Sequence, residues 1–187
     1  FYVKSCGDIS NQDFAISKEL PTGTMQIVLS WQTTNPVTGN DLDSHIQIPD
    51  NSSQAWHLHW ARNTGGFEQG DDYFVYGAGD NVTLDRDEQD PPGTETITIV
   101  KVRSGTYSYS VHDYTNRDNA SSCSSCTKLA DSGATVTVYL GTSLPGSDTA
   151  KKYYVPGGAG TLWKVFTFTE SGGLTGVGTM HFEDTFG

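Results

Sequence analysis

Two short acidic stretches hold the residues of this sequence that are best suited to metal chemistry. The stretch "DLDSH" places Asp41 and Asp43 two positions apart, and "LDRDEQDPPGTE" supplies Asp85, Asp87 and Glu95 around a Pro-Gly turn. Asp85 and Asp87 share a side if their stretch is extended. Calcium takes roughly six to eight oxygen ligands, and carboxylates are its usual charged donors. If the two stretches meet at one end of the fold, they predict a calcium site. The alternative is that these residues are solvated and serve only as Asx-turn formers.

Histidine offers a second kind of metal chemistry. His57 and His59 stand two apart in "AWHLHWA" and share a face if that stretch is a strand. Together with His45 or His112 they could bind zinc or copper. We favour the simpler interpretation, in which Trp56, Leu58 and Trp60 build the core and the two histidines face solvent or accept polar contacts.

A third interpretation needs no metal. His45 and His112 could hydrogen-bond Asp41 and Asp43 across neighbouring strands and lock the fold as a polar network. A carboxylate–imidazolium pair of this kind raises the pKa of the histidine and lowers that of the aspartate. The sequence gives this network the same weight as the calcium site.

Catalytic patterns are weak by comparison. The chain has 22 acidic residues, so a pair of carboxylates suited to glycoside hydrolysis is expected by chance and does not indicate that activity. It has no G-x-S-x-G nucleophile elbow, and the sequence "HD" at 112–113 is unspecific. We therefore expect a protein that is not an enzyme.

Composition limits the partners. The 187 residues include 22 Asp and Glu against 11 Lys and Arg, giving a net charge of -11. Such a field repels phosphate backbones, so nucleic acid is not expected as a partner. No apolar run approaches the ~18 residues of a membrane span. The mean hydropathy of -0.44 is that of a polar globular domain.

The elements that must position these residues are short strands. Alternating runs between Gly, Pro, Asn and Asp clusters predict eleven of them. They are residues 24–31, 44–48, 55–61, 72–77, 81–85, 94–102, 105–114, 134–141, 151–156, 161–169 and 176–182. This pattern predicts an all-β protein, a single antiparallel β-sandwich of the immunoglobulin-like or jelly-roll-like kind, over residues 24–187. Residues 1–23 are expected to form an N-terminal extended arm or an edge strand.

The cysteines and sequons point to a secreted chain. Its cysteines are Cys6, Cys123 and Cys126, and either one of the last two pairs with Cys6 or the two close a small loop together. In either case one cysteine has no partner within the chain, and in a secreted protein such a cysteine can form a disulfide with another chain. Asn51, Asn81 and Asn119 lie in glycosylation sequons, and all three are expected in or near loops.

Five stretches taken together carry a resemblance to a known group of domains. They are "IVLSW…DLDSHI", "LDRDEQD…ETITI", "GTYSYSVHDYTN", "LADSGATVTVYLG" and "GTLWKVFTF". In these the sequence resembles an uncharacterised family of secreted or cell-surface β-sandwich domains in bacterial and protist extracellular proteins, over residues 24–182. The resemblance implies an extracellular sandwich used for binding or assembly, and it implies no catalytic residue. Where that family commonly has G-x-G-P-E, this chain has "PPGTE".

These observations lead to one expected function and two rivals. We expect an extracellular adhesion or self-assembly module, such as a subunit of a surface filament, whose partners are copies of itself or another cell-surface protein. The first rival is a calcium-dependent carbohydrate-binding module, because the chain is rich in Trp and Tyr that can stack on sugars. The second rival is a metal-dependent or glycoside-acting enzyme.

Overall fold

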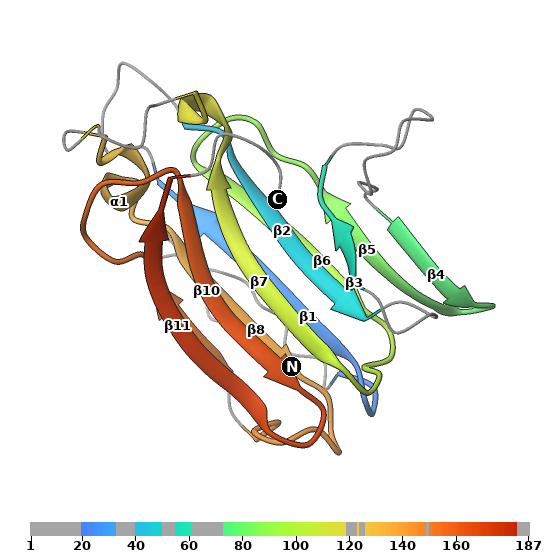
Figure 1. Cartoon of the computed structure of the whole chain (residues 1–187). Coiled ribbons are helices and arrows are strands. Elements are labelled where there is room, and N and C mark those ends of the chain that lie inside the picture. Colours follow the sequence, from blue (N-terminus) through green and yellow to red (C-terminus); the bar gives the residue numbers. More distant parts are fainter. Residues whose placement is uncertain are drawn as a thin grey trace, which may run out of the picture.

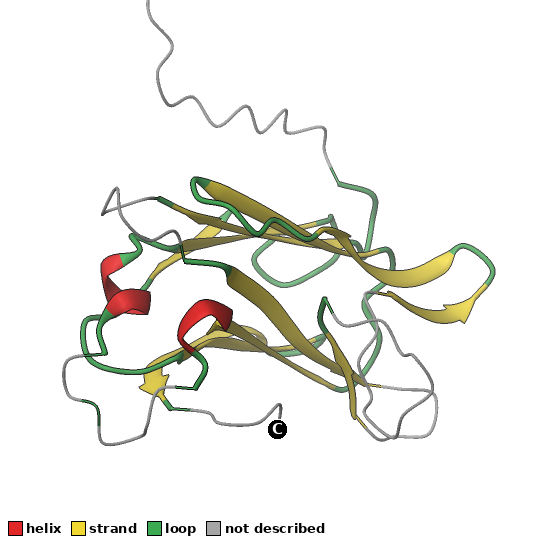
Figure 2. Ribbon diagram, turned by 90° about the horizontal axis from the view of Figure 1, so that it is seen from above, coloured by secondary structure: helices red, strands yellow, loops and turns green. Residues whose placement is uncertain are grey.

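Two antiparallel sheets packed face to face make up the fold. The computed structural model describes residues 20–32, 40–49, 55–60, 73–118, 123, 126–148 and 150–182. One sheet has six strands in the order β4-β5-β6-β1-β8-β9, and the other has five in the order β11-β10-β7-β2-β3. Figure 1 shows the two sheets face on, and Figure 2 shows them edge on as two layers with the short helical turns at one end. The chain is therefore an all-β sandwich, as the strand pattern predicts.

The strands follow one another through the sequence with only two short helical turns between them in the described residues. The strands are β1 Met25–Trp31, β2 Leu42–Pro49, β3 Ala55–Leu58, β4 Tyr73–Gly77, β5 Asp80–Arg86, β6 Gly93–Ile99, β7 Thr106–Asp113, β8 Thr135–Leu140, β9 Lys151–Tyr154, β10 Leu162–Thr169 and β11 Gly173–His181. A 3-10 turn, η1, covers Tyr114–Asn116, and the helix α1 covers Lys128–Asp131.

The period-2 alternation of side chains explains why these segments form a sandwich. In β1 every second residue is buried, and in β8 the alternate valines face the same interior. Trp31 and Trp163 are among the largest buried side chains of the core between the sheets. The Trp31 indole also donates a hydrogen bond of 2.9 Å to the carbonyl of Asn40, which ties the segment before β2 to the end of β1.

All eleven predicted strands are confirmed, with bounds that differ by a few residues. The strand pattern does not predict η1 or α1. Asn81 is the second residue of β5 and follows the turn at residues 78–79, so it lies near a loop, as expected. The predictions for Cys6, Asn51 and Asn119, and those for residues 1–19, fall outside the described residues.

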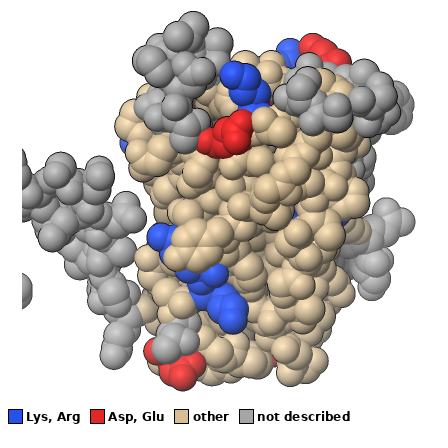
Figure 3. Space-filling model, turned by 90° about the vertical axis from the view of Figure 1, so that its left-hand side faces the viewer, with Lys and Arg blue, Asp and Glu red and all other residues tan. Residues whose placement is uncertain are grey.

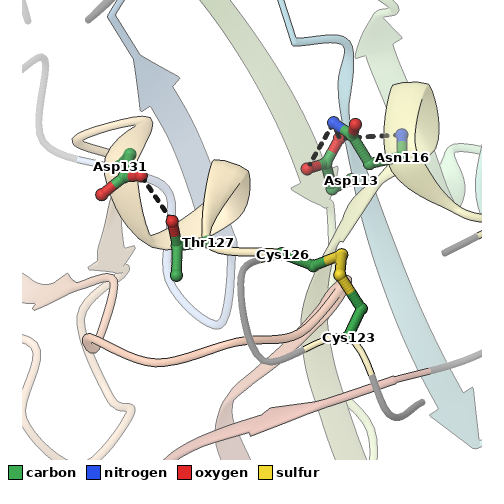
Figure 4. Close-up of a disulfide and its surroundings, with 6 residues drawn as sticks. All are labelled: Asp113, Asn116, Cys123, Cys126, Thr127 and Asp131. Atoms are coloured by element: carbon green, nitrogen blue, oxygen red, sulfur yellow. Dashed lines mark hydrogen bonds between the residues drawn. A yellow bond between two sulfur atoms is a disulfide. The ribbon is translucent and has the colours of Figure 1, made fainter. Parts of the chain in front are cut away.

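Cys123 and Cys126 form a disulfide with each other (Figure 4). The small-loop alternative is thus the one that the structure has, and the alternative of a bridge from either of them to Cys6 is wrong. The bridge lies close to η1, where the Asp113 carboxylate accepts hydrogen bonds from the backbone and side chain of Asn116. On the other side of the bridge, Thr127 donates to Asp131 across the first turn of α1.

The charge of the molecule is unevenly distributed over its surface. On the side seen in Figure 3, one group of basic side chains lies below the middle and others lie at the top, where they neighbour acidic side chains; a further acidic patch lies at the lower end. In the described part of the chain, no helix is long and apolar enough to cross a membrane.

Candidate metal centre

The site is built where β2 extends past the end of its neighbour β3. β3 pairs with β2 only from Ile46 to Pro49, so residues 42–45 of β2 have no β3 partner. Glu95 reaches this stretch from the opposite sheet, and its Oε2 accepts a hydrogen bond of 2.7 Å from the backbone N–H of Ser44. The hydroxyl of Ser44 pairs with that of Tyr109 at 2.8 Å, so the inner side of β2 is polar at this one position.

Glu95 occupies a position that the strand pattern reserves for an apolar side chain. In β6 it alternates inward with Gly93, Ile97 and Ile99, and it lies opposite Leu29 of β1. It is 0% exposed. A buried carboxylate is costly unless a hydrogen bond, a proton or a cation compensates its charge.

Three carboxylates converge at this point. Oxygen atoms of Asp43, Asp87 and Glu95 all lie within 4.8 Å of one another. They come from β2, from the connection between β5 and β6, and from β6 itself, so the group joins the two sheets. Asp43 is 2% exposed, whereas Asp87 is exposed to solvent. Oδ2 of Asp43 and Oε1 of Glu95 are buried and have no hydrogen-bond partner among the described residues.

Burial and mutual repulsion decide the charge of these groups in the absence of a cation. Burial, and then the neighbouring Glu95 carboxylate, raises the pKa of Asp43 to about 9. Burial raises the pKa of Glu95 to about 8, although the hydrogen bonds from Ser44 oppose the shift. At neutral pH both groups therefore hold protons, which a bound cation would have to displace.

The five acidic residues that the sequence singled out divide into three sets. Asp43, Asp87 and Glu95 form the group. Asp41 lies just before β2, and burial, followed by the charge of Asp87, raises its pKa to about 6; its Oδ1 is buried and has no hydrogen-bond partner among the described residues. Asp85 is not part of the group.

Asp85 instead binds two threonines, and this corrects the expectation that it is a ligand. Its oxygens accept hydrogen bonds of 2.5 Å from Thr83 and 2.6 Å from Thr98. The expectation that Asp85 and Asp87 share a side assumed an unbroken strand. The β5–β6 register shifts between Leu84 and Arg86, so the alternation does not run through this segment.

Beside the carboxylates lies a cluster of histidines. The ring centroid of His45 is 5.0 Å from that of His57, 5.0 Å from that of His59 and 5.4 Å from that of His112. His45 Nδ1 and His57 Nε2 lie 2.9 Å apart and share a hydrogen bond. Burial lowers the pKa of His57 and His112 to about 4 and places that of His45 well below its ordinary value. At neutral pH these three imidazoles are therefore neutral.

The polar network expected of His45 and His112 stays a prediction. Asp43 does lie directly opposite His112 across neighbouring strands. Burial, however, lowers the pKa of both histidines and raises that of Asp43, which is the opposite of what a carboxylate–imidazolium pair would do.

Of the two alternatives for His57 and His59, solvent exposure or polar contacts, the structure favours contacts. His59 is 4% exposed and its ring stacks on that of His45, while His57 shares a hydrogen bond with His45. His57 is partly buried. Of Trp56, Leu58 and Trp60, the residues expected to build the core, only Leu58 is fully buried.

This arrangement has two kinds of ligand within one small region. The carboxylate group offers hard oxygen donors, which suit calcium or magnesium. Asp43, His45 and His112 form a second set, with ligand atoms all within 4.8 Å of one another. The "DLDSH" motif therefore contributes one residue to both sets and one to the histidine set alone.

Comparisons with known proteins support the fold and nothing finer. No protein-family model matches the sequence, and no curated protein matches it. A solved structure titled as that of a protein of unknown function, SAV2460, is similar with a TM-score of 0.53 and 15% sequence identity. The match covers 88% of this chain and 91% of that one. At this identity the likeness shows a shared sandwich architecture.

Proposed function

We propose that this protein is a non-enzymatic β-sandwich module that works by association, and that a divalent cation joins its two sheets at the end of β2. The observation that carries the proposal is the convergence of Asp43, Asp87 and Glu95. Two of the three are buried, and each of those two has a buried oxygen without a hydrogen-bond partner in the described residues. A cation is the ligand that would satisfy such oxygens.

Calcium is the cation that the donor set favours. All three side chains are carboxylates, which are hard oxygen ligands of calcium. Asp41, whose pKa responds to the charge of Asp87, is close enough to add to the field that attracts a cation. Backbone carbonyls and water would complete the coordination, because calcium accepts flexible and irregular geometry whereas magnesium demands a near-ideal octahedron.

An extracellular role in adhesion or self-assembly fits these features. The Cys123–Cys126 disulfide is a bond that persists in oxidising compartments. The outer strands β4, β9, β11 and β3 present four sheet edges, and an extended segment of another chain could add to such an edge through main-chain hydrogen bonds. In this proposal the partners are copies of the same chain or another cell-surface protein, and the family resemblance of the motifs agrees with it.

Native mass spectrometry, with and without a chelator, tests the proposal in one experiment. We expect a mass increment of one calcium that the chelator removes, together with oligomers. Deleting residues 1–20 should weaken those oligomers if the N-terminal arm adds to a neighbouring sheet. A truncated protein that assembles as well as the whole chain would refute the arm, and a chain without bound metal would refute the cation site.

The exposure of Asp87 favours a second candidate function, calcium-dependent binding of carbohydrate. Asp87 is exposed while its two partner carboxylates are buried, so a cation held by all three would lie close to solvent. Sugar hydroxyls bind to calcium ions that keep open coordination positions. Binding to a glycan array that disappears with a chelator would support this function, and a flat response on a broad array would count against it.

A further inference from the structure

The histidine cluster gathers most of the chain's imidazoles on one face of the five-stranded sheet. Four of the five histidines of the sequence lie in it, and the fifth, His181, is exposed at the end of β11. His45 lies in β2, His112 in β7 and His57 in β3, and His59 follows the end of β3. These three strands are neighbours in the order β7-β2-β3, so the sheet itself brings the rings together.

The strand register explains which of these residues meet. Asp43 of β2 lies directly opposite His112 of β7, and His45 follows two positions later on the same face of β2. Ile46 pairs with Leu58, the last residue of β3, and the ring of the next residue, His59, stacks on that of His45 with centroids 5.0 Å apart. Directly opposed side chains in an antiparallel pair have Cβ atoms roughly 4.5–5.5 Å apart, close enough to share one ion.

The distances suit a transition metal. The ligand atoms of Asp43, His45 and His112 lie within 4.8 Å of one another. Ligands of a tetrahedral zinc ion, at about 2.0–2.2 Å from the metal, are separated by roughly 3.3 Å, so small side-chain rotations would close the set. Two imidazoles and one carboxylate, with a position for a fourth ligand, are a donor set that zinc accepts.

The hydrogen bond between His45 and His57 also suits this role. A histidine that binds a metal usually donates its other ring N–H to a nearby acceptor, which fixes the tautomer and the ring orientation. His45 Nδ1 lies 2.9 Å from His57 Nε2. If His45 donates through Nδ1, its Nε2 is the nitrogen that faces a metal.

We propose that Asp43, His45 and His112 form a zinc site, with His59, His57 or water as the fourth ligand. The site differs from the carboxylate site in its chemistry, because borderline nitrogen donors select zinc, whereas calcium takes oxygen donors. Asp43 is the one residue that belongs to both. Because the other ligands differ, variants of Glu95 and of His112 let the two proposals fail separately.

The test is zinc titration into chelator-stripped protein, followed by calorimetry, with cobalt as a spectroscopic substitute. We expect one zinc per chain. His112→Gln should weaken zinc binding at least tenfold, and His181→Gln is the matched control that should leave it unchanged. Glu95→Gln should leave zinc binding intact, whereas His112→Gln should leave calcium binding intact. Zinc affinity in His112→Gln within twofold of the parent protein would overturn the proposal, as would an equal loss in His181→Gln.

A measurement on the unaltered chain covers the case in which a histidine variant fails to fold. Two-bond ¹H–¹⁵N spectra of the histidine rings report directly on nitrogen ligation. We expect the ring nitrogens of His45 and His112 to shift on addition of zinc while those of His181 stay in place. A response confined to His181, or none in the clustered rings, would overturn the site.

Discussion

Replacing Glu95 by Gln should remove the response to calcium and at the same time make the metal-free fold more stable. Glu95 is fully buried, and its pKa is raised to about 8 from the ordinary value of 4.5. Folding at pH 7.5 therefore requires this carboxyl to take up a proton that the unfolded chain has released. Three pH units above 4.5 correspond to roughly 4 kcal/mol of lost stability. Gln carries no such penalty, and its carbonyl oxygen can still accept the hydrogen bond from Ser44.

Calcium should also stabilise the unaltered protein. Calcium at 100 times its dissociation constant should stabilise the fold by about 2.7 kcal/mol. For a domain of this size, that corresponds to a rise in melting temperature of roughly 5–11 °C. The Glu95→Gln variant should show no such rise, because one of its three carboxylates is missing and a neutral amide binds calcium less strongly.

Thermal unfolding followed by circular dichroism, at pH 7.5 with chelator or with calcium, measures both effects. Glu170→Gln is the matched control: Glu170 is exposed at the end of β10 and accepts a hydrogen bond from Ser104. It should leave the calcium response unchanged. An equal calcium-induced rise in the Glu95→Gln variant and in the parent protein would refute the reasoning, and so would a metal-free Glu95→Gln variant that melts well below its parent.

Three further predictions follow from the same structure. In metal-free protein, the free energy of unfolding should fall as pH rises from 7 to 8, by about 2 kcal/mol, because Asp43 (pKa about 9) and Glu95 (pKa about 8) stay protonated only in the folded chain. The lowered pKa values of His45, His57 and His112 act in the opposite direction, mainly below pH 7. Urea denaturation at several pH values checks this, and a flat profile between pH 7 and 8 contradicts it. Gly93→Ala should lower the free energy of unfolding by about 1–3 kcal/mol or more, because the added Cβ would lie 2.0 Å from the Trp31 ring. Gly77→Ala is the control: no atom lies within 4 Å of its Cβ, so it should lower the free energy of unfolding less in the same assay. Reduction of the Cys123–Cys126 bridge should lower the free energy of unfolding by only about 2 kcal/mol, because the bridge closes a loop with a sequence separation of 3. Peptide mapping without reductant should find these two cysteines linked to each other, and a link from either to Cys6 would contradict the assignment.

The alternating pattern of the sequence predicts the strands and the sandwich, and the position of Glu95 in that pattern also points to the site. Glu95 shares a face with Ile97 and Ile99, so the alternation alone places a carboxylate on the inward side of β6. The sequence does not reveal that Asp43 comes from the other sheet to meet it. That contact depends on how the two sheets pack against each other. It also depends on β3 ending before it can pair with residues 42–45 of β2.

The errors in the sequence analysis have local physical causes. The break in register after Leu84 separates Asp85 from Asp87, and periodicity cannot show such a break. The pattern of the sequence suggests an ion pair among His45, His112 and Asp43, whereas burial, which the pattern does not reveal, is the largest cause of all three pKa shifts. Burial of polar residues on the outer face of a sheet depends on neighbours that alternation does not describe.

Calcium content after equilibrium dialysis tests the central claim most directly. Chelator-stripped protein would be dialysed against calcium, and the bound metal would be measured by mass spectrometry for the parent chain and for Glu95→Gln. The convergence of Asp43, Asp87 and Glu95 predicts one calcium per parent chain and none in the variant. A parent chain that retains no calcium, or a variant that retains as much as its parent, would contradict the account.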